Sequence, residues 1–321
     1  MSSPPEQALL TVAIATFNGR QLLEGVLASL QRQTIAVQIR VVVIDDGSSD
    51  DTVRWLREHR PDVQLIAHEG NLGVSRSLNE GLGLAEGEFL ALLNNDIELE
   101  PDCLELLVQE LYDHPEAAAS TPKLLDFHRR DHLDGAGDEY TWWGMANRRG
   151  HGELDRGQYD LPEAVFGASA ALAVYRRSAI ETVGGLDEEF FAYLEDVDWS
   201  MRALLAGFQC RYQPQAVAYH MGSATLGSGP SEFNLFHMWR NGVWILVKDV
   251  PASLLLRHSP QLVIGQLWHL GKAIGERRLG VWARAWAAAL RGLPAMLAKR
   301  RAIQSQRAVA PGELARWISR R

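Results

Sequence analysis

The chain has 321 residues, of which 46% are hydrophobic and 22% charged, so it can bury a large core and is neither disordered nor collagen-like. Two cysteines, Cys103 and Cys210, cannot form a disulfide framework or a zinc site by themselves, and they favour a reducing, cytoplasmic compartment. The net charge of −8 is unevenly divided, because residues 252–321 contain 13 Lys and Arg but only two acids. We therefore expect a flexible N-terminus (1–8), an acidic body (9–251) and a basic tail (252–321).

In the body, apolar segments with the length of buried strands alternate with segments of helical periodicity. This order indicates an α/β fold with a mostly parallel sheet that is covered by helices on both faces. The glycine-rich stretch 126–165 predicts an irregular loop of the kind that often contacts a substrate. Strands are predicted at 9–15, 39–44, 63–67, 88–93, 169–175 and 216–219, and helices at 22–30, 51–59, 74–85 and 195–206, with another beginning near Pro101.

Polar side chains follow three of these strands directly. Asn18, Asp45 and Asp96 each stand just past a predicted strand end. In parallel sheets the ligand crevice lies at the carboxyl ends of the strands, so we expect these residues to converge there. A GxxxxGK[ST] phosphate loop is absent from the sequence, so a phosphate site would need another device.

Asp96, beside Asn95, can supply that device by holding a hard divalent cation that bridges phosphate oxygens. His220, at the end of another strand, is the candidate for a second ligand. The alternatives are a turn residue for Asp96 and a hydrogen-bonded strand-end histidine for His220. Asp45 could accept a hydrogen bond from the imide N–H of uracil or thymine, or could form an Asx turn between strand and helix.

The segment 195–199 (EDVDW) places three acids in the first turn of a helix. The helix dipole stabilises a carboxylate there, which makes it available as a general base. Simple charge complementarity with the helix end is the alternative. Asp198 precedes Arg202 by four residues and is expected to pair with it.

Seven stretches in this order resemble the family 2 glycosyltransferases of GT-A type, particularly the rhamnosyltransferase-like group. The resemblance spans residues 9–251, and within it Arg240-Asn241 and Lys248 also resemble the rhamnosyltransferase-like group. The stretches are 13–18 (AIATFN), 43–48 (VIDDGS), 71–73 (NLG), 92–96 (LLNND), 184–188 (GGLDE), 195–199 (EDVDW) and 220–223 (HMGS).

The resemblance implies a role for each candidate residue. Asp45 would contact a pyrimidine base, and Asp96 would bind the metal at the end of a DxD-type motif in which Asn94 stands where a first carboxylate often stands. Asp196 would be the catalytic base, Glu195 would support the acceptor, and His220 would complete the metal–diphosphate site. The implied nucleoside pocket consists of Thr16, Asn18, Asn71, Gly73 and Asn95.

The implied reaction is an inverting, metal-dependent transfer that uses Mg²⁺ or Mn²⁺. The donor would be a dTDP-sugar, with rhamnose suggested, or a UDP-sugar. The acceptor would be a saccharide or lipid-linked hydroxyl in bacterial cell-surface polysaccharide synthesis. Trp142, Trp143 and Trp199 are candidates to stack on sugar faces of the acceptor, or alternatively are core and loop-anchoring aromatics.

The tail predicts a basic amphipathic helix. Arg277, Arg284 and Arg291 recur every seven residues, and apolar surface stands beside them. Such a helix is typical of proteins that bind an anionic membrane surface, here the inner face of the plasma membrane. Packing on the acidic body or forming a homo-oligomer are the alternatives, and no nucleic-acid-binding fold is recognisable. The apolar residues are Trp282, Trp286, Leu290 and Leu293.

The N-terminal residues lack the basic region of a signal peptide, and no charge-free run of 18 apolar residues predicts a spanning helix.

Two rival functions are also compatible with the sequence. A sugar nucleotidyltransferase would need a glycine-rich, basic loop after the first strand, which residues 16–20 (TFNGR) match poorly. A non-catalytic membrane-surface module would tolerate Asp196→Asn.

Overall fold

The computed structural model describes residues 9–222 and 231–319, so the predicted flexible N-terminus, 1–8, lies outside the described residues. The N-terminal half contains β1 (Leu9–Thr16), α1 (Arg20–Gln31), β2 (Gln38–Asp45), α2 (Thr52–His59), β3 (Gln64–Ala67), α3 (Val74–Gly83), β4 (Phe89–Asn94), β5 (Ile97–Leu99), α4 (Cys103–Asp113) and β6 (Ala117–Asp126). There follow β7 (Leu133–Gly135), β8 (Asp138–Thr141), β9 (Ala146–Arg148), β10 (Glu163–Val165), β11 (Leu172–Arg176), α5 (Arg177–Val183), the 3₁₀ turn η1 (Glu188–Phe190), α6 (Glu195–Leu205) and β12 (Gln209–His220). The C-terminal part contains α7 (Glu232–Lys248), α8 (Ala252–Arg257), α9 (Ser259–Gly275), α10 (Leu279–Ser305), α11 (Pro311–Trp317) and β13 (Ile318–Ser319).

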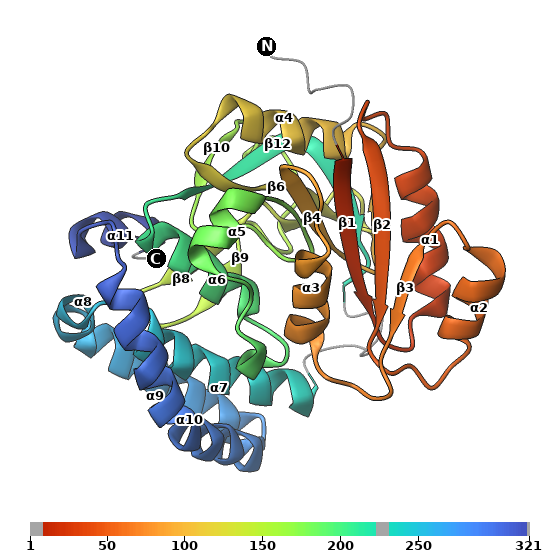
Figure 1. Ribbon diagram of the computed structural model, residues 1–321. Coiled ribbons are helices and arrows are strands. Elements are labelled where there is room, and N and C mark those ends of the chain that lie inside the picture. The colour runs from red at the N-terminus through yellow and green to blue at the C-terminus, as the bar shows by residue number, and fades with distance from the viewer. Residues whose placement is uncertain (1–8, 223–230, 320–321) are drawn as a thin grey trace.

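The predicted mostly parallel sheet is confirmed. Its strand order is β10-β12-β6-β11-β4-β1-β2-β3 (Figure 1). β1 pairs in parallel with both β2 and β4, and β6 pairs in parallel with β12, whereas β11 and β10 run antiparallel to their neighbours. The carboxyl ends of β1, β2, β4, β6 and β12 therefore meet at one edge, where a ligand crevice is expected.

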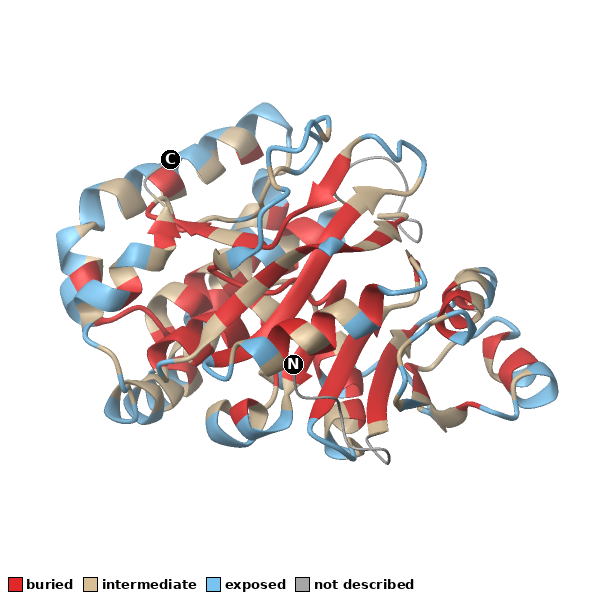
Figure 2. Cartoon of the chain, turned by 90° about the horizontal axis from the view of Figure 1, so that it is seen from above, coloured by how far each residue is buried: buried red, intermediate tan, exposed pale blue. Residues whose placement is uncertain are grey.

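Helices cover both faces of the sheet, as predicted. Apolar residues of α1, α2 and α4 share one core with the strands, and α3, α5 and α6 form the other. Figure 2 shows the strands buried between these helices, whose outer faces are exposed. A third core joins the far side of α6 to α7, α8, α10 and α11. The helix α6 is therefore held from both sides, which stabilises the position of its first turn.

Two strands differ from the sequence-based expectation. β6 was not predicted, because its sequence, AAASTPKLLD, is rich in small residues and contains Pro122, which are weak strand signals. β12 is longer than the predicted 216–219, and its pairing with β6 shifts register between Gln213 and Val217. Stretch 126–165 is also more regular than expected, since β7, β8, β9 and β10 lie within it.

The tail packs on the body. α10 lies along α7 on the side of the molecule away from β1–β3 (Figure 1), and its inward residues Val281, Ala285 and Ala289 are buried. Lys299 adds ion pairs of 2.5 Å to Asp187 and 3.2 Å to Glu189. This arrangement corresponds to the packing alternative for the tail. Of the apolar residues predicted beside the arginines, Trp282 and Trp286 are partly buried against neighbouring cores, whereas Leu290 is 56% exposed.

Candidate active site

The loops after β1 and β2 are joined by Asn18. Its backbone N–H donates to Ser48 Oγ at 2.7 Å, and its side-chain oxygen accepts from the N–H of Ser49 at 2.8 Å and of Asp50 at 3.2 Å. Asn18 has a positive φ of 50°, which asparagine tolerates better than most residues. These hydrogen bonds fix the loop after β1 against the loop after β2, at the edge of the predicted nucleoside pocket.

Asp45 is fully buried at the end of β2. One carboxylate oxygen, Oδ1, accepts from the N–H of Ser48, three residues on, at 2.9 Å, so the side chain closes the turn between β2 and α2. The other oxygen, Oδ2, has no hydrogen-bond partner among the described residues. A buried carboxylate oxygen without a partner is unfavourable unless a ligand supplies a donor, so both interpretations of Asp45 are compatible with this geometry.

Asp46 holds the next loop against β2. Its carboxylate accepts from the N–H of Leu72 at 2.8 Å and of Gly73 at 2.9 Å. Gly73 has a φ of 94° and lies so close to Phe191 that a Cβ would be 2.7 Å from it, so only glycine fits. Asn71 accepts from the Gly73 N–H at 3.2 Å. The predicted residues Asn71 and Gly73 therefore line the same edge as Asp45.

Asp96 and His220 are brought together by β5. Ile97 of β5 pairs with His220 of β12, and the Nε2 atom of His220 lies 3.3 Å from Asp96 Oδ1. Beside them, Asn95 donates to Thr16 Oγ1 at 2.8 Å, which ties the end of β4 to the end of β1. The two predicted metal ligands thus face each other although they are far apart in sequence.

Asp134 of β7 contacts the other side of the His220 ring. Its Oδ2 lies 2.7 Å from Nδ1 of His220, and Arg148 of β9 bonds to Asp134 and lies 3.3 Å from the same ring nitrogen. A carboxylate on Nδ1 fixes the ring orientation and leaves Nε2 directed at Asp96, as in many metal-ligating histidines. Asp134 and Arg148 were not among the predicted site residues, because they lie in the stretch 126–165, for which an irregular loop was expected.

The charges around His220 are strongly coupled. Burial lowers the pKa of His220, but hydrogen bonds to Asp134 and Asp96 outweigh it and raise the pKa to about 9. Burial raises the pKa of Asp134, but its contacts with His151, His220 and Arg148 hold it well below its usual range. The two carboxylates on either side of the ring therefore stabilise the protonated imidazolium, and a metal bound at Nε2 would have to displace that proton.

The donor set fits a divalent metal in part. A carboxylate oxygen and an imidazole nitrogen are suitable ligands for Mn²⁺ and, through the oxygen, for Mg²⁺. Within 9–222 and 231–319 no group of three or more His, Cys, Asp or Glu side chains is placed to hold a metal alone. Waters and the oxygens of a bound diphosphate would have to complete the coordination, as is usual for Mg²⁺.

Glu195 and Asp196 begin α6 at the same edge. Asp196 accepts from the N–H of Ala170 at 3.0 Å and of Val197 at 2.8 Å, and burial raises its pKa more than these bonds lower it. Glu195 is buried with Oε2 unpartnered among the described residues, and burial and the charge of Asp196 raise its pKa to about 8. Buried Asp138 of β8, also missed by the sequence analysis, has its pKa raised by burial and by Asp196.

The chain before α6 is strained. Phe191, Tyr193 and Leu194 all have positive φ angles, of 64°, 68° and 67°. Such angles cost energy for residues with a Cβ and persist only when the surroundings hold them. This strain lies directly before the two acids, where it positions them.

Asn241 and Arg240 of α7 hold the strained segment. The Asn241 amide donates to the carbonyl oxygens of Phe190, Ala192 and Tyr193 at 3.1, 2.9 and 2.7 Å. Arg240 donates to the Phe190 carbonyl at 2.7 Å. Arg240 and Asn241, which belong to the family resemblance, thus hold the backbone of residues 190–193 in place.

A buried ion network lies behind α6. Lys248 is 1% exposed, contacts Asp198 and lies 2.7 Å from Asp187. Asp198 also accepts from Arg202 at 2.9 Å, which confirms the predicted pair. Burial raises the pKa of Asp198, but Lys248 and Arg202 lower it to about 2. Asp198 is therefore a structural carboxylate that fixes α6, whereas Asp196 is the partly exposed one.

Two of the three predicted acceptor-stacking tryptophans are corrected. Trp199 is 1% exposed, donates to the Gly184 carbonyl at 2.9 Å and packs edge-on against Tyr175, so it belongs to the core. Trp142 is also buried and stacks on His258 at 3.6 Å between ring centroids. Trp143 is partly exposed and stays a candidate.

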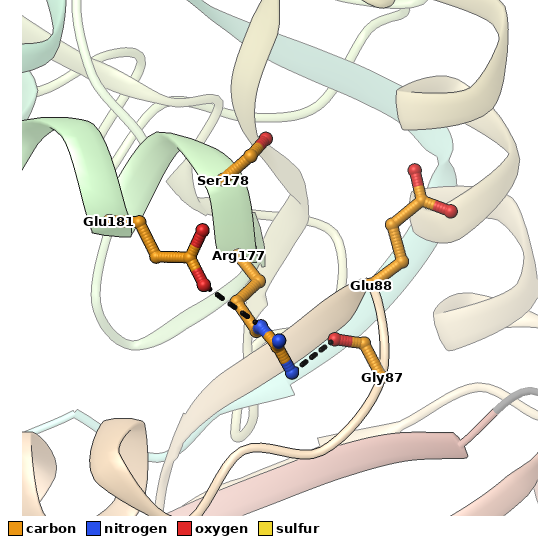
Figure 3. A pocket seen from close by; sticks show the side chains of 5 residues that line it. All are labelled: Gly87, Glu88, Arg177, Ser178 and Glu181. Carbon is orange, nitrogen blue, oxygen red and sulfur yellow. Dashed lines mark hydrogen bonds and ion pairs between the residues drawn. The ribbon is translucent and has the colours of Figure 1, made fainter.

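A separate cavity of about 390 Å³ lies at the opposite end of β4 (Figure 3). Arg177 crosses it, with bonds of 3.1 Å to Glu181 and 3.4 Å to the Gly87 carbonyl. The remaining lining residues are Glu88 and Ser178. Since β4 begins beside this cavity and ends beside Asp96, the cavity is not part of the site at the carboxyl ends.

The sheet and its ligand edge have the arrangement of the GT-A fold. A solved structure shares this fold: the chain resembles GalNAc-T7, crystallised with UDP, GalNAc and Mn²⁺, with a TM-score of 0.60 and 16% identity over 75% of this chain and 48% of that one. The model of the family "Glycosyl transferase family 2" matches residues 11–184. The chain belongs to this family.

Two curated relatives with different printed names are similar to this chain. A pre-mycofactocin glycosyltransferase of Mycobacterium tuberculosis is 30% identical over 227 residues, which are 68% of this chain and 44% of that protein. An N-acetylglucosaminyl-diphospho-decaprenol L-rhamnosyltransferase of the same species is 27% identical over 256 residues, 71% of this chain and 81% of that one. The match thus spans less than half of the first relative.

Proposed function

We propose that this protein is an inverting, metal-dependent glycosyltransferase of bacterial cell-surface polysaccharide synthesis, working at the cytoplasmic side. It would transfer a sugar from a pyrimidine-diphosphate donor to a hydroxyl group of a saccharide or lipid-linked acceptor. The observation that carries the proposal is the placement of two groups of acids at one sheet edge. One group, Asp96 and Asp134, flanks His220, and the other is the Glu195–Asp196 pair at the start of α6. Arg148 connects them, because it contacts Asp134 and His220 and its charge lowers the pKa of Asp196 against the larger effect of burial.

The proposed reaction uses Asp196 as general base. Its carboxylate accepts the proton of the acceptor hydroxyl while that oxygen attacks the anomeric carbon and the bond from this carbon to the diphosphate oxygen breaks. Attack opposite the leaving group inverts the configuration. Neutral Glu195, with its raised pKa, can donate a hydrogen bond to the acceptor. A metal held by Asp96 and His220 would supply positive charge for the departing diphosphate, and the Arg148 guanidinium adds more.

For the donor, we propose UDP or dTDP as the nucleotide. Support comes from the unpartnered Oδ2 of Asp45, which can accept the imide N–H of uracil or thymine. The GT-A protein described above was crystallised with UDP and Mn²⁺. Rhamnose as the sugar and a lipid diphosphate as the acceptor carrier rest on the printed name of one relative.

Calorimetric titration with UDP, dTDP, GDP and ADP, each with and without Mn²⁺, tests the proposal. We expect Mn²⁺-dependent binding of UDP or dTDP, and loss of that dependence in Asp96→Ala. Asp196→Asn should keep nucleotide binding but lose transfer by more than about a hundredfold. A folded protein that binds none of the diphosphates, or an active Asp196→Asn variant, would contradict the proposal.

A further inference from the structure

The helix α9 packs closely against the body at one small residue. Its inward face approaches the turn of the β8–β9 hairpin so closely that a Cβ at Gly265 would lie 2.0 Å from the Trp143 carbonyl oxygen. Ala273 on the same face is fully buried. The inward side of α9 is therefore determined by two small residues that allow close packing.

The outward face of α9 is apolar. Its large side chains are exposed and recur at i, i+1, i+4, i+5 and i+11, which places them on one side of the helix, opposite Gly265. Leu256 of α8 and Leu279 of α10 adjoin α9 in the chain and are exposed as well. The exposed fractions are 57% for Val263, 51% for Ile264, 59% for Leu267, 52% for Trp268 and 58% for Ile274. We name these five residues the α9 apolar face.

An exposed face of this kind is the reverse of an ordinary surface helix, which turns polar residues to solvent. Contiguous exposed apolar patches mark interaction surfaces. Among the described residues, no helix has the length and hydrophobicity to cross a membrane. The α9 apolar face therefore has the properties of a surface that binds a partner or a membrane without crossing it.

Basic residues border this face. Lys272 places its ammonium 5.4 Å from the centre of the Trp268 ring, so it can extend from the apolar surface towards anionic groups. Arg257 before α9 and Arg277 after it are exposed, and neither forms an ion pair within the described part of the chain. Glu276, paired loosely with Lys272 at 3.9 Å, is the one acid between residues 252 and 312. The charge complement of this surface is therefore anionic.

We propose that the α9 apolar face docks on a bilayer of anionic lipid, with α9 lying in the headgroup plane. Apolar side chains would enter the acyl boundary, and Lys272, Arg257 and Arg277 would contact lipid phosphates. We assign the docking to α9 and not to α10, because α10 packs along α7 and the two tryptophans expected beside its arginines, Trp282 and Trp286, are partly buried against neighbouring cores, while Leu290 is exposed.

The placement of α9 has a consequence for the site. Gly265 rests on the turn at Trp143, and the hairpin strand that follows this turn ends at Arg148, beside His220. Docking of α9 would thus hold one wall of the active site near the membrane. This agrees with a lipid-linked acceptor, although bilayer binding itself does not depend on the transfer reaction.

Flotation with vesicles tests the inference. Full-length protein is mixed with vesicles of phosphatidylcholine containing phosphatidylglycerol, and with pure phosphatidylcholine vesicles, at low and high salt. We expect binding to the anionic vesicles that weakens with salt, and a loss of at least about tenfold in Leu267→Glu/Trp268→Glu. Leu161→Glu, at a leucine of the body that is 77% exposed, is the matched control and should bind as the wild type does.

Three results would overturn the inference: no binding of wild type to anionic vesicles, equal binding by the double variant, or a concentration-dependent dimer that the double variant abolishes. Light scattering detects the dimer, which would mean that a second copy covers the face. Thermal unfolding confirms that the variants are folded. UDP binding in the double variant should be unchanged, so failure of this inference is distinguishable from failure of the proposed function.

Discussion

Glu195→Gln tests the electrostatics of the acid pair. In the folded protein burial and the neighbouring Asp196 raise the pKa of Glu195 from 4.5 to about 8, whereas the unfolded chain ionises near 4.5. The folded state therefore keeps a proton that the unfolded state loses, and stability falls as pH rises through this window. At about 1.4 kcal/mol per pH unit, the fold loses roughly 4 kcal/mol between pH 4.5 and pH 7.5. An amide cannot ionise, so the variant should not suffer this loss.

The assay is urea unfolding of wild type and variant at several pH values between 5 and 8. The variant should gain stability relative to wild type steadily across the range, while its transfer rate should change little, because the glutamine N–H can still donate a hydrogen bond to the acceptor. Glu181→Gln, at an exposed glutamate of α5, controls for removal of a negative charge. A stability difference that stays constant with pH would refute the assignment of a neutral, buried Glu195.

Three further outcomes are expected. Lys248→Met should lower the unfolding free energy by about 3–5 kcal/mol because it removes the buried cation shared by Asp187 and Asp198, whereas Lys272→Met, at a partly exposed lysine, should change it by under about 1 kcal/mol in denaturant titrations. Asp134→Asn should weaken Mn²⁺-dependent UDP binding by about 10–100-fold in calorimetry, since His220 loses its orienting carboxylate, and unchanged affinity would exclude that role. Asn241→Leu should reduce kcat by up to about a hundredfold with nucleotide affinity retained, because the loop before α6 loses its donors, and an unaltered rate would show that this loop holds its own shape.

Most of the sheet and its polar edge were predictable from local pattern. Continuous apolar segments such as β1 and β4 identify buried parallel strands, and polar residues directly after them must meet at one edge because parallel strands share direction. Asp45 and Asp96 follow from this rule alone. β6 did not follow, because its burial results from pairing with β11 and β12 and not from a strong preference of its small residues for strands.

The sequence by itself determined which chemical groups reach the ligand edge, because strand periodicity and direction are local properties. Only the tertiary structure decided how they work together. The contact of Asp134 with His220 and the support of residues 190–193 by Asn241 join segments 86 and about 50 residues apart. It also decided which side chains face outward, since exposure depends on what packs against each face: Trp199 and Ala285 of α10 are covered, whereas Trp268 of α9 is exposed.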